Sequence, residues 1–370
     1  MLDKIRWDTE RGMPDHQAPI AAVLRVSIVI CCYNSRSRLR KTLECLSRQC
    51  DVGFSDWEIV LVDNASTDDT SRVAQDLWRE FGAPCEMRVV KEPKAGLIHA
   101  RFAGIAAARF EILSFVDDDN WICPAWCATI LRLMAADPHL GVIGSRNEAA
   151  FDSGQSVPLW FAPVQHGYAI GRQAPASGPP PQRMPRFFGA GLTVRRKGMR
   201  DILEAGFVPV LTGRSGDRLM AGDDSELCYA LGIRGWKFWY EESLLLHHYM
   251  PPGRLTHAYA LRLWFGLGYA AAIEDIYTEA LPPVSLRERI KHWPVMRWFA
   301  ALRGWLHHET ASFLSPGGSL KSQQRAIRAK YFRGRIAGLI DKPRYVRGVT
   351  AQIARMKAAG PLTPFEDQAV

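Results

Sequence analysis

Three adjacent aspartates, Asp117, Asp118 and Asp119, follow directly after an apolar run that extends from Ile112 to Val116. An apolar run of this length, rich in residues that favour strands, predicts a buried strand. Three neighbouring carboxylates repel one another unless a cation holds them together. Such oxygen-rich clusters suit Mg²⁺ or Mn²⁺, and these ions usually take a substrate's phosphates as further ligands. A solvated acidic turn is the alternative interpretation, and for an isolated triplet it would be the better one.

Asp223 and Asp224 form a second acidic pair, preceded by Gly222 and followed by a helical pattern that extends to Leu231. A carboxylate in a site can accept a proton from an attacking hydroxyl group, as a general base does. Helix N-termini also favour carboxylates, so a pair of capping acids is the plain alternative. For an unplaced pair, capping is the more common outcome.

Two histidines, His247 and His248, follow the apolar run Leu244-Leu245-Leu246, and Arg254 comes shortly after them. A histidine at a strand end can bind a metal or a diphosphate, although an ordinary strand-end histidine is an equal alternative. Arg254 could neutralise a diphosphate, or it could cap the next element.

An alternation of strand and helix patterns begins at Val26 and would position these residues. It predicts a mostly parallel sheet sandwiched by helices, of the Rossmann type. The predicted strands are 26–31, 57–62, 87–90, 112–116 and 141–144, and the predicted helices are 37–49, 68–81, 97–109, 124–136 and 223–231.

Polar residues end the first two predicted strands. Tyr33 and Asn34 follow the first strand, and Asp63 and Asn64 follow the second. In open α/β sheets, ligands bind just outside the carboxyl ends of the strands. A tyrosine ring there can stack on a base, and Asp or Asn can bind the base's polar edge. A simple turn and a helix cap are the alternatives for these segments, but the arrival of three polar strand ends at one edge favours a nucleotide site.

Five segments, in this order, resemble the inverting family 2 glycosyltransferases of the GT-A type. The resemblance runs from Val26 to about Arg254, and it implies a GT-A-like fold. It also implies transfer of a sugar from a nucleotide-sugar donor with inversion, assisted by Mn²⁺ or Mg²⁺. The five segments are 26–35, 58–68, 96–101, 115–120 and 222–231.

The resemblance assigns roles to matching positions. Asp224 aligns with the catalytic base, and Asp223 stands beside it where Glu is more common. Asp119 aligns with the chief metal ligand, supported by Asp117, and His248 best matches a histidine near the metal. The positions that bind the nucleotide sugar are Cys31, Tyr33, Asn34, Asp63, Asn64, Arg101, Asp117 and Asp118.

The sequence departs from the family's pattern at two places. Cys31 and Cys32 replace a small or hydroxyl-bearing pair, and Asn64 stands where Asp is frequent. Both departures concern the base, so UDP is favoured among nucleotides without being settled. We also expect a glycan or lipid-linked acceptor, and a role in the synthesis of cell-surface polysaccharide or glycoconjugates.

Other classes of protein compete with this interpretation. A nucleotidyltransferase acting on a sugar phosphate would show a glycine-rich basic loop after the first strand, and residues 34–38 are a poor substitute. A non-catalytic carbohydrate-binding or scaffold protein is a further alternative, opposed by the intact acids. Gly189-Ala190-Gly191 lacks the context of a dinucleotide fingerprint. Four aromatic residues could form a sugar platform but are more often core, namely Trp160, Phe161, Trp236 and Trp239.

The charge distribution and the cysteines indicate how the chain is organised and in which compartment it works. The formal charge is +9 over 370 residues, and residues 251–370 contain 18 Lys and Arg against 8 Asp and Glu. Eight cysteines show neither paired zinc spacing nor a disulfide framework, and no secretory signal is apparent, so we expect a cytoplasmic protein. The expected parts are a loose lead-in (1–24), a catalytic domain (25–254) with nucleotide-sugar-binding (25–150) and acceptor-binding (151–254) halves, and a helical basic region (255–370).

The basic C-terminal region contains an apolar stripe between Pro294 and His308. Trp with flanking Arg and Lys suits a helix that lies in a membrane interface, so we expect peripheral attachment to an anionic surface on the inner face of the cytoplasmic membrane. An amphipathic helix packed on the catalytic domain is the alternative. Nucleic acid is not expected, because no recognised binding module accompanies the charge. The stripe consists of Val295, Trp298, Phe299, Leu302, Trp305 and Leu306.

Overall fold

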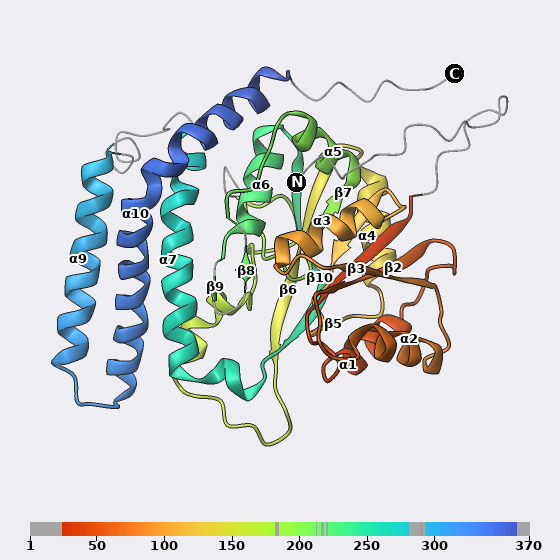
Figure 1. The fold of residues 1–370 in the computed structure, drawn as a ribbon, viewed down its shortest axis with the longest axis horizontal. Coiled ribbons are helices and arrows are strands. Elements are labelled where there is room, and N and C mark those ends of the chain that lie inside the picture. The colour runs from red at the N-terminus through yellow and green to blue at the C-terminus, as the bar shows by residue number, and fades with distance from the viewer. Residues whose placement is uncertain are drawn as a thin grey trace.

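A computed structural model describes residues 24–181, 185–211, 213–215, 218–219, 221–280, 290 and 293–360. Ten strands lie within these ranges: β1 (Val26–Cys32), β2 (Trp57–Asn64), β3 (Glu86–Glu92), β4 (Ile112–Phe115), β5 (Asn120–Ile122), β6 (Leu140–Ala150), β7 (Thr193–Arg195), β8 (Arg214–Ser215), β9 (Arg218–Leu219) and β10 (Lys237–Tyr249). Eight of them form one sheet in the order β3-β2-β1-β4-β7-β6-β10-β5, and β8 pairs with β9 (Figure 1). The expected lead-in lies outside the described residues except for Leu24.

Helices cover the sheet, and the C-terminal helices lie to one side of it (Figure 1). Those described are α1 (Leu39–Ser47), α2 (Thr70–Glu80), α3 (Leu97–Ala107), α4 (Trp126–Ala136), α5 (Arg196–Glu204), α6 (Asp223–Ile233), α7 (His257–Glu279), α9 (Pro294–Phe313) and α10 (Leu320–Ala358), with the 3₁₀ helices η2 (Ala162–Tyr168) and η3 (Pro252–Leu255). The described part of the chain contains no helix that is long and apolar enough to cross a membrane.

Alternate side chains of the central strands build two apolar layers, because successive residues of a strand point to opposite faces. Ile28 and Ile59 pack in one layer with α1, α2 and α4. Val29 and Val60 pack in the other with α3, α5, α6 and α7. Burial on both faces explains why these strands are near-continuous hydrophobic runs. The predicted α/β sandwich is confirmed.

The two halves of the sheet differ in strand direction. The first four strands in the sheet order, β3, β2, β1 and β4, are all parallel neighbours, as predicted. Further along, β7 runs antiparallel to both β4 and β6, and β5 runs antiparallel to β10. The strands β5 and β7 have three residues each and were not predicted, since so short a run carries little periodic signal. His247 and His248 lie inside β10, not beyond its end, which corrects the expected strand boundary.

The C-terminal helices α7, α10 and α9 lie side by side, with α9 outermost (Figure 1). Helices α7 and α10 cross closely at glycines: a Cβ on Gly268 would lie 1.9 Å from the carbonyl oxygen of Tyr331, and one on Gly334 would lie 2.0 Å from that of Phe265. Both α7 and the end of α10 contribute to the apolar layer on the sheet. The expected boundary near residue 254 therefore separates two segments that share one core, and the division into domains stays a prediction.

Candidate active site

The aspartate triplet forms the turn between β4 and β5. Asn120 holds this turn: its backbone N–H donates to the carbonyl of Asp117 at 3.1 Å, and its side-chain oxygen accepts from the Asp117 N–H at 3.0 Å. Asp118 and Asp119 are buried, whereas Asp117 is partly exposed. The triplet is thus an ordered turn at the carboxyl end of β4, not a solvated acidic loop.

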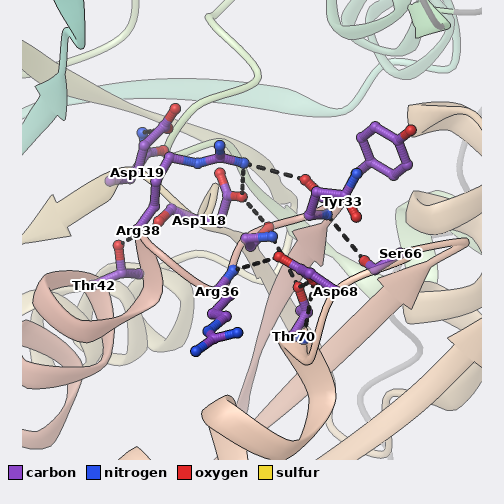
Figure 2. Close-up of polar contacts among 12 residues, drawn as sticks. Tyr33, Arg36, Arg38, Thr42, Ser66, Asp68, Thr70, Asp118 and Asp119 are labelled. Carbon is purple, nitrogen blue, oxygen red and sulfur yellow. Dashed lines mark hydrogen bonds and ion pairs between the residues drawn. The ribbon is translucent and has the colours of Figure 1, made fainter.

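Asp118 is held by the loop that follows β1 (Figure 2). Its carboxylate accepts hydrogen bonds from the Ser35 hydroxyl and from Arg38, the latter at 2.6 Å, and its carbonyl accepts from Thr42. Burial raises the pKa of Asp118, and the neighbouring charge of Asp119 adds to this, while Arg38 opposes both. Arg38 and Ser35 were not predicted, because nothing in their local pattern indicates a partner 80 residues away.

Asp119 meets residues from β10 and from η3. One carboxylate oxygen accepts from Arg254 Nη2 at 2.6 Å, and the other lies 3.4 Å from His248 Nε2 and accepts from Asn120 at 3.0 Å. Arg254 Nη1 also lies 3.0 Å from His248 Nε2. The antiparallel pairing of β10 with β5 places His248 opposite Asn120, which explains how a histidine mid-strand reaches the triplet.

Asp119 and His248 are spaced closely enough to share a divalent cation, at a point where the Arg254 guanidinium contacts both of them. Neighbouring ligand atoms of an octahedral ion are about 3 Å apart, close to the separation seen here, and carboxylate with imidazole is a suitable donor pair. Within the described ranges, no three His, Cys, Asp or Glu side chains converge as one ligand set, so Asp117 does not join the other two predicted ligands. Such a pair leaves room for phosphate and water ligands, as Mg²⁺ sites usually do.

The loops after β1 and β2 are tied to each other through Asn34. Its side-chain oxygen accepts from the Thr67 N–H at 2.8 Å, and its own N–H donates to the Ser66 hydroxyl at 3.0 Å. Its φ of 49° lies in the left-handed region, which asparagine tolerates better than most residues. Next to it, the Tyr33 ring is 56% exposed and points away from the carboxylates (Figure 2).

The neighbours Asp63 and Asn64 differ in their hydrogen-bond partners. Asn64 donates to the carbonyls of Glu92 and Lys94 and accepts from the Gly96 N–H at 2.8 Å, so its amide organises the turn between β3 and α3. Asp63 accepts from Ser71 through Oδ2, while its buried Oδ1 has no hydrogen-bond partner. A buried acceptor of this kind is costly unless a donor reaches it.

The second acidic pair begins α6. Asp224 accepts two backbone hydrogen bonds, from Gly189 at 2.7 Å and from Ser225 at 2.8 Å. Desolvation raises the pKa of Asp224, and the adjacent Asp223 raises it further, against the lowering effect of Arg101 and the two N–H groups. Asp223 forms an ion pair with the buried Arg101.

Arg101 lies between the two acidic sites. Burial lowers its pKa, but the carboxylates of Asp223, Asp117 and Asp224 outweigh burial and raise it, so the guanidinium stays charged. Cys31 is close to the same charges, and desolvation raises the pKa of its thiol to about 12. Arg101 therefore joins the strand-end triplet and the α6 pair into one region.

Gly189 is a member of this site that the sequence did not reveal. A Cβ there would lie 2.4 Å from Arg101 Nη2 and 3.3 Å from the Asp224 Cβ, so a larger residue would displace the Arg101 guanidinium and crowd Asp224. The sequence around Gly189 and Gly191 does not match a dinucleotide fingerprint, and it indicates no other role for these glycines. Of the aromatic residues considered for a sugar platform, Trp160, Phe161 and Trp236 are buried in the core.

Comparisons with known proteins agree on family and fold. Residues 27–199 match the model of glycosyl transferase family 2. EpsH of Bacillus subtilis (strain 168), named as a glycosyltransferase, is 32% identical over 115 residues, which cover 31% of this chain and 32% of EpsH. Chondroitin synthase of Escherichia coli is 29% identical over 123 residues, which cover 33% of this chain and 17% of that protein. The matches thus span a third or less of either relative.

A solved structure supports the same fold at low identity. Mannosyltransferase PcManGT from Pyrobaculum calidifontis, in complex with GDP-Man and Mn²⁺, has a TM-score of 0.52 and is 18% identical. The alignment covers 94% of this chain and 89% of that one, so it includes the C-terminal helical region. The prediction of a GT-A-like sheet flanked by helices, with a helical C-terminal region, is confirmed.

Proposed function

We propose that this chain, whose residues 27–199 belong to glycosyl transferase family 2, transfers a sugar from a nucleotide-sugar donor to a glycan or lipid-linked acceptor with inversion. The position of Arg101 carries the proposal. This buried cation interacts with Asp117 at the strand-end site and with Asp223 and Asp224 at the start of α6. A donor-binding acidic cluster and a candidate base therefore face one region, as a transfer between two bound substrates requires.

The donor's nucleotide would lie along the ends of β1 and β2. The unpartnered Oδ1 of Asp63 would accept an N–H of the base, and the exposed ring of Tyr33 would stack on it. An acceptor at this point suits the ring N–H of uracil, thymine or guanine and disfavours adenine and cytosine, and among the first three we favour uracil, as the family resemblance implies. Asn64 would act indirectly, by fixing the turn between β3 and α3.

The diphosphate would lie against the triplet, where two arginines, Arg38 and Arg254, supply positive charge. Asp119 and His248 would hold a Mn²⁺ or Mg²⁺ ion, which when bound neutralises the diphosphate as it becomes the leaving group. Asp118, fixed by Ser35 and Arg38, would position the ribose.

The transfer step would use Asp224 as the base. The acceptor's hydroxyl oxygen attacks the anomeric carbon, its proton passes to an Asp224 carboxylate oxygen, and the bond from that carbon to the diphosphate oxygen breaks. The raised pKa of Asp224 suits this task, since a base is most effective when its pKa approaches the working pH. Attack from the side opposite the leaving group inverts the anomeric centre.

The donor assignment is tested by thermal shift with UDP-, GDP- and dTDP-sugars, each with and without Mn²⁺. We expect UDP-sugars with Mn²⁺ to raise the unfolding temperature most, because a ligand that binds only the folded state stabilises it by mass action. The Asp63→Ala variant should lose this preference and keep its own unfolding temperature without ligand. A larger shift with GDP-sugars would overturn the uracil assignment, and no shift with any donor would overturn the proposed function.

The proposed class of acceptor is inferred from the relatives of this chain. The similarity to chondroitin synthase supports a role in polysaccharide or glycoconjugate synthesis. We place the reaction in the cytoplasm, where nucleotide sugars are made, with the protein attached peripherally to the inner face of the membrane.

A further inference from the structure

Helix α9 has its amphipathic character reversed. A helix on a globular protein usually turns its apolar stripe to the core and its polar face to water. The side of α9 that faces the protein instead carries Arg297 and Ala301, both buried, and Gly304, which packs against the Phe332 ring of α10. Arg297 pairs there with Asp275 and Glu279 of α7. The inner face of α9 is thus held by small residues and ion pairs.

Most large apolar side chains of α9 lie on its outer face, whereas Trp305 is half-buried. Val295 and Phe299 are 74% and 58% exposed, and Leu302 and Leu306 continue the stripe at helical spacing. At the end of the helix, Phe313 and Leu314 are 89% and 80% exposed. A contiguous exposed apolar surface of this kind marks an interaction site, whereas single exposed apolar residues need no explanation. The partner of this face must itself offer an apolar layer.

The charge around this stripe indicates which partner it is. Together, α9 and α10 contain 13 Lys and Arg against 2 Asp and Glu, and three of these cations, Arg297, Arg335 and Lys342, pair with Asp275 and Glu279 of α7. Arg303 and Arg328 are exposed, and Arg328 and Arg325 lie close enough to His308 of α9 to lower its pKa, after burial and the His307 charge. A second copy of this chain would bring two basic faces together. An anionic lipid surface offers both negative headgroups and an apolar layer beneath them.

We infer that the outer face of α9, with Phe313 and Leu314, lies in the interface of an anionic membrane, and that nearby cations bind the lipid headgroups. The helix would lie along the membrane plane, since its opposite face is packed on α10 (Figure 1). This inference deepens the proposed function, because a lipid-linked acceptor is presented at such a surface, yet lipid binding can be measured without transfer.

The full chain would be floated with vesicles of neutral lipid and with vesicles containing 30 mol% phosphatidylglycerol, at low and high salt. We expect flotation with the anionic vesicles that weakens in high salt, because salt screens the charge attraction. Arg303→Ala with Arg328→Ala should weaken it by about fivefold per residue at low salt. Phe299→Glu with Leu302→Glu should weaken binding at both salt concentrations.

Phe54→Glu is the matched control, because Phe54 is exposed in the catalytic domain far from α9 in sequence. It should float like the parent, and all variants should bind UDP with Mn²⁺ equally in calorimetry. If the parent stays off both vesicles, or if the α9 variants float unchanged, the inference fails. A concentration-dependent dimer that the α9 variants abolish would identify a second copy as the partner and also overturn it. If the parent floats with vesicles but does not bind UDP, the proposed function is refuted and the inference about the membrane stands.

Discussion

The two acidic sites contain the same residue type, but the protein surrounds them differently. At the end of β4, Asp118 and Asp119 each have an arginine of their own, Arg38 and Arg254. At the start of α6, one arginine is shared, and its ion pair is with Asp223. Asp224 is held mainly by two backbone N–H groups.

The difference teaches how a carboxylate's partners select its chemistry. A carboxylate whose charge is matched by a guanidinium suits a site where charges are exchanged with a phosphate or a metal ion. Burial raises the pKa of both Asp118 and Asp224, so the partners distinguish them: a desolvated carboxylate with no arginine ion pair of its own, held by backbone N–H groups, suits proton transfer. The comparison predicts distinct losses when each site is altered.

Asp224→Asn should cause the largest effect. The change removes the proton acceptor and keeps the size of the side chain, so turnover should fall by roughly 10²–10⁴-fold, the usual contribution of a general base. Donor affinity should stay near that of the parent, because the strand-end site is untouched. Steady-state kinetics with donor affinity by calorimetry measures both, with Asp51→Asn, at an exposed position, as the control. Transfer at the parental rate would show that the pair only caps α6.

Asp119→Ala should act on binding, with the fold intact. It removes the carboxylate that meets both Arg254 and His248, and we expect Mn²⁺-dependent UDP affinity to be abolished. Titration calorimetry with UDP, in Mn²⁺ and in EDTA, separates the metal-dependent part. Unchanged affinity in Mn²⁺ would contradict the assignment, and a loss equal in Mn²⁺ and EDTA would indicate that Asp119 acts only through Arg254.

Glu226 provides the smallest and most specific test, because no arginine among the described residues pairs with this third acid of α6 and the proposed transfer step does not use it. Burial raises the pKa of Glu226 from its usual 4.5 to about 7, against hydrogen bonds from Tyr277, Leu211 and Val210. The folded state therefore holds this proton more tightly than the unfolded state does. Its contribution to stability is complete below about pH 4.5 and is lost as pH rises toward about 7.

Glu226→Gln should remove that dependence, which amounts to roughly 3–4 kcal/mol over the full shift from 4.5 to about 7, at about 1.4 kcal/mol per pKa unit. Urea unfolding at pH 5 and pH 7.5 measures it, and the free energy of unfolding should change less between these values in the variant than in the parent. Glu204→Gln, at an exposed position of α5, is the control. An equal fall in the parent and in Glu226→Gln would show that another group titrates.

The first half of the sheet was predictable because its signal is local. Strands such as β1 and β2 are buried on both faces and appear as unbroken apolar runs, and the helices between them have regular periodicity. Strands β5 and β7 were missed because three residues show no period, and the extent of β10 was missed because it mixes buried and exposed positions over 13 residues.

The sequence by itself determined the class of fold, the positions of the aspartate triplet and the acidic pair, and the apolar stripe of α9, because residue type and short spacing carry that information. The tertiary structure decided that this stripe faces away from the protein. Only the tertiary structure decided the partners. Arg38 meets Asp118 across 80 residues, Arg101 meets Asp223 across 122, and Arg254 meets Asp119 across 135. A long side chain finds such a partner through the packing of strands and helices, and no local pattern encodes that choice. The same holds for Gly189, whose role depends on a backbone approach that exists only in the folded chain.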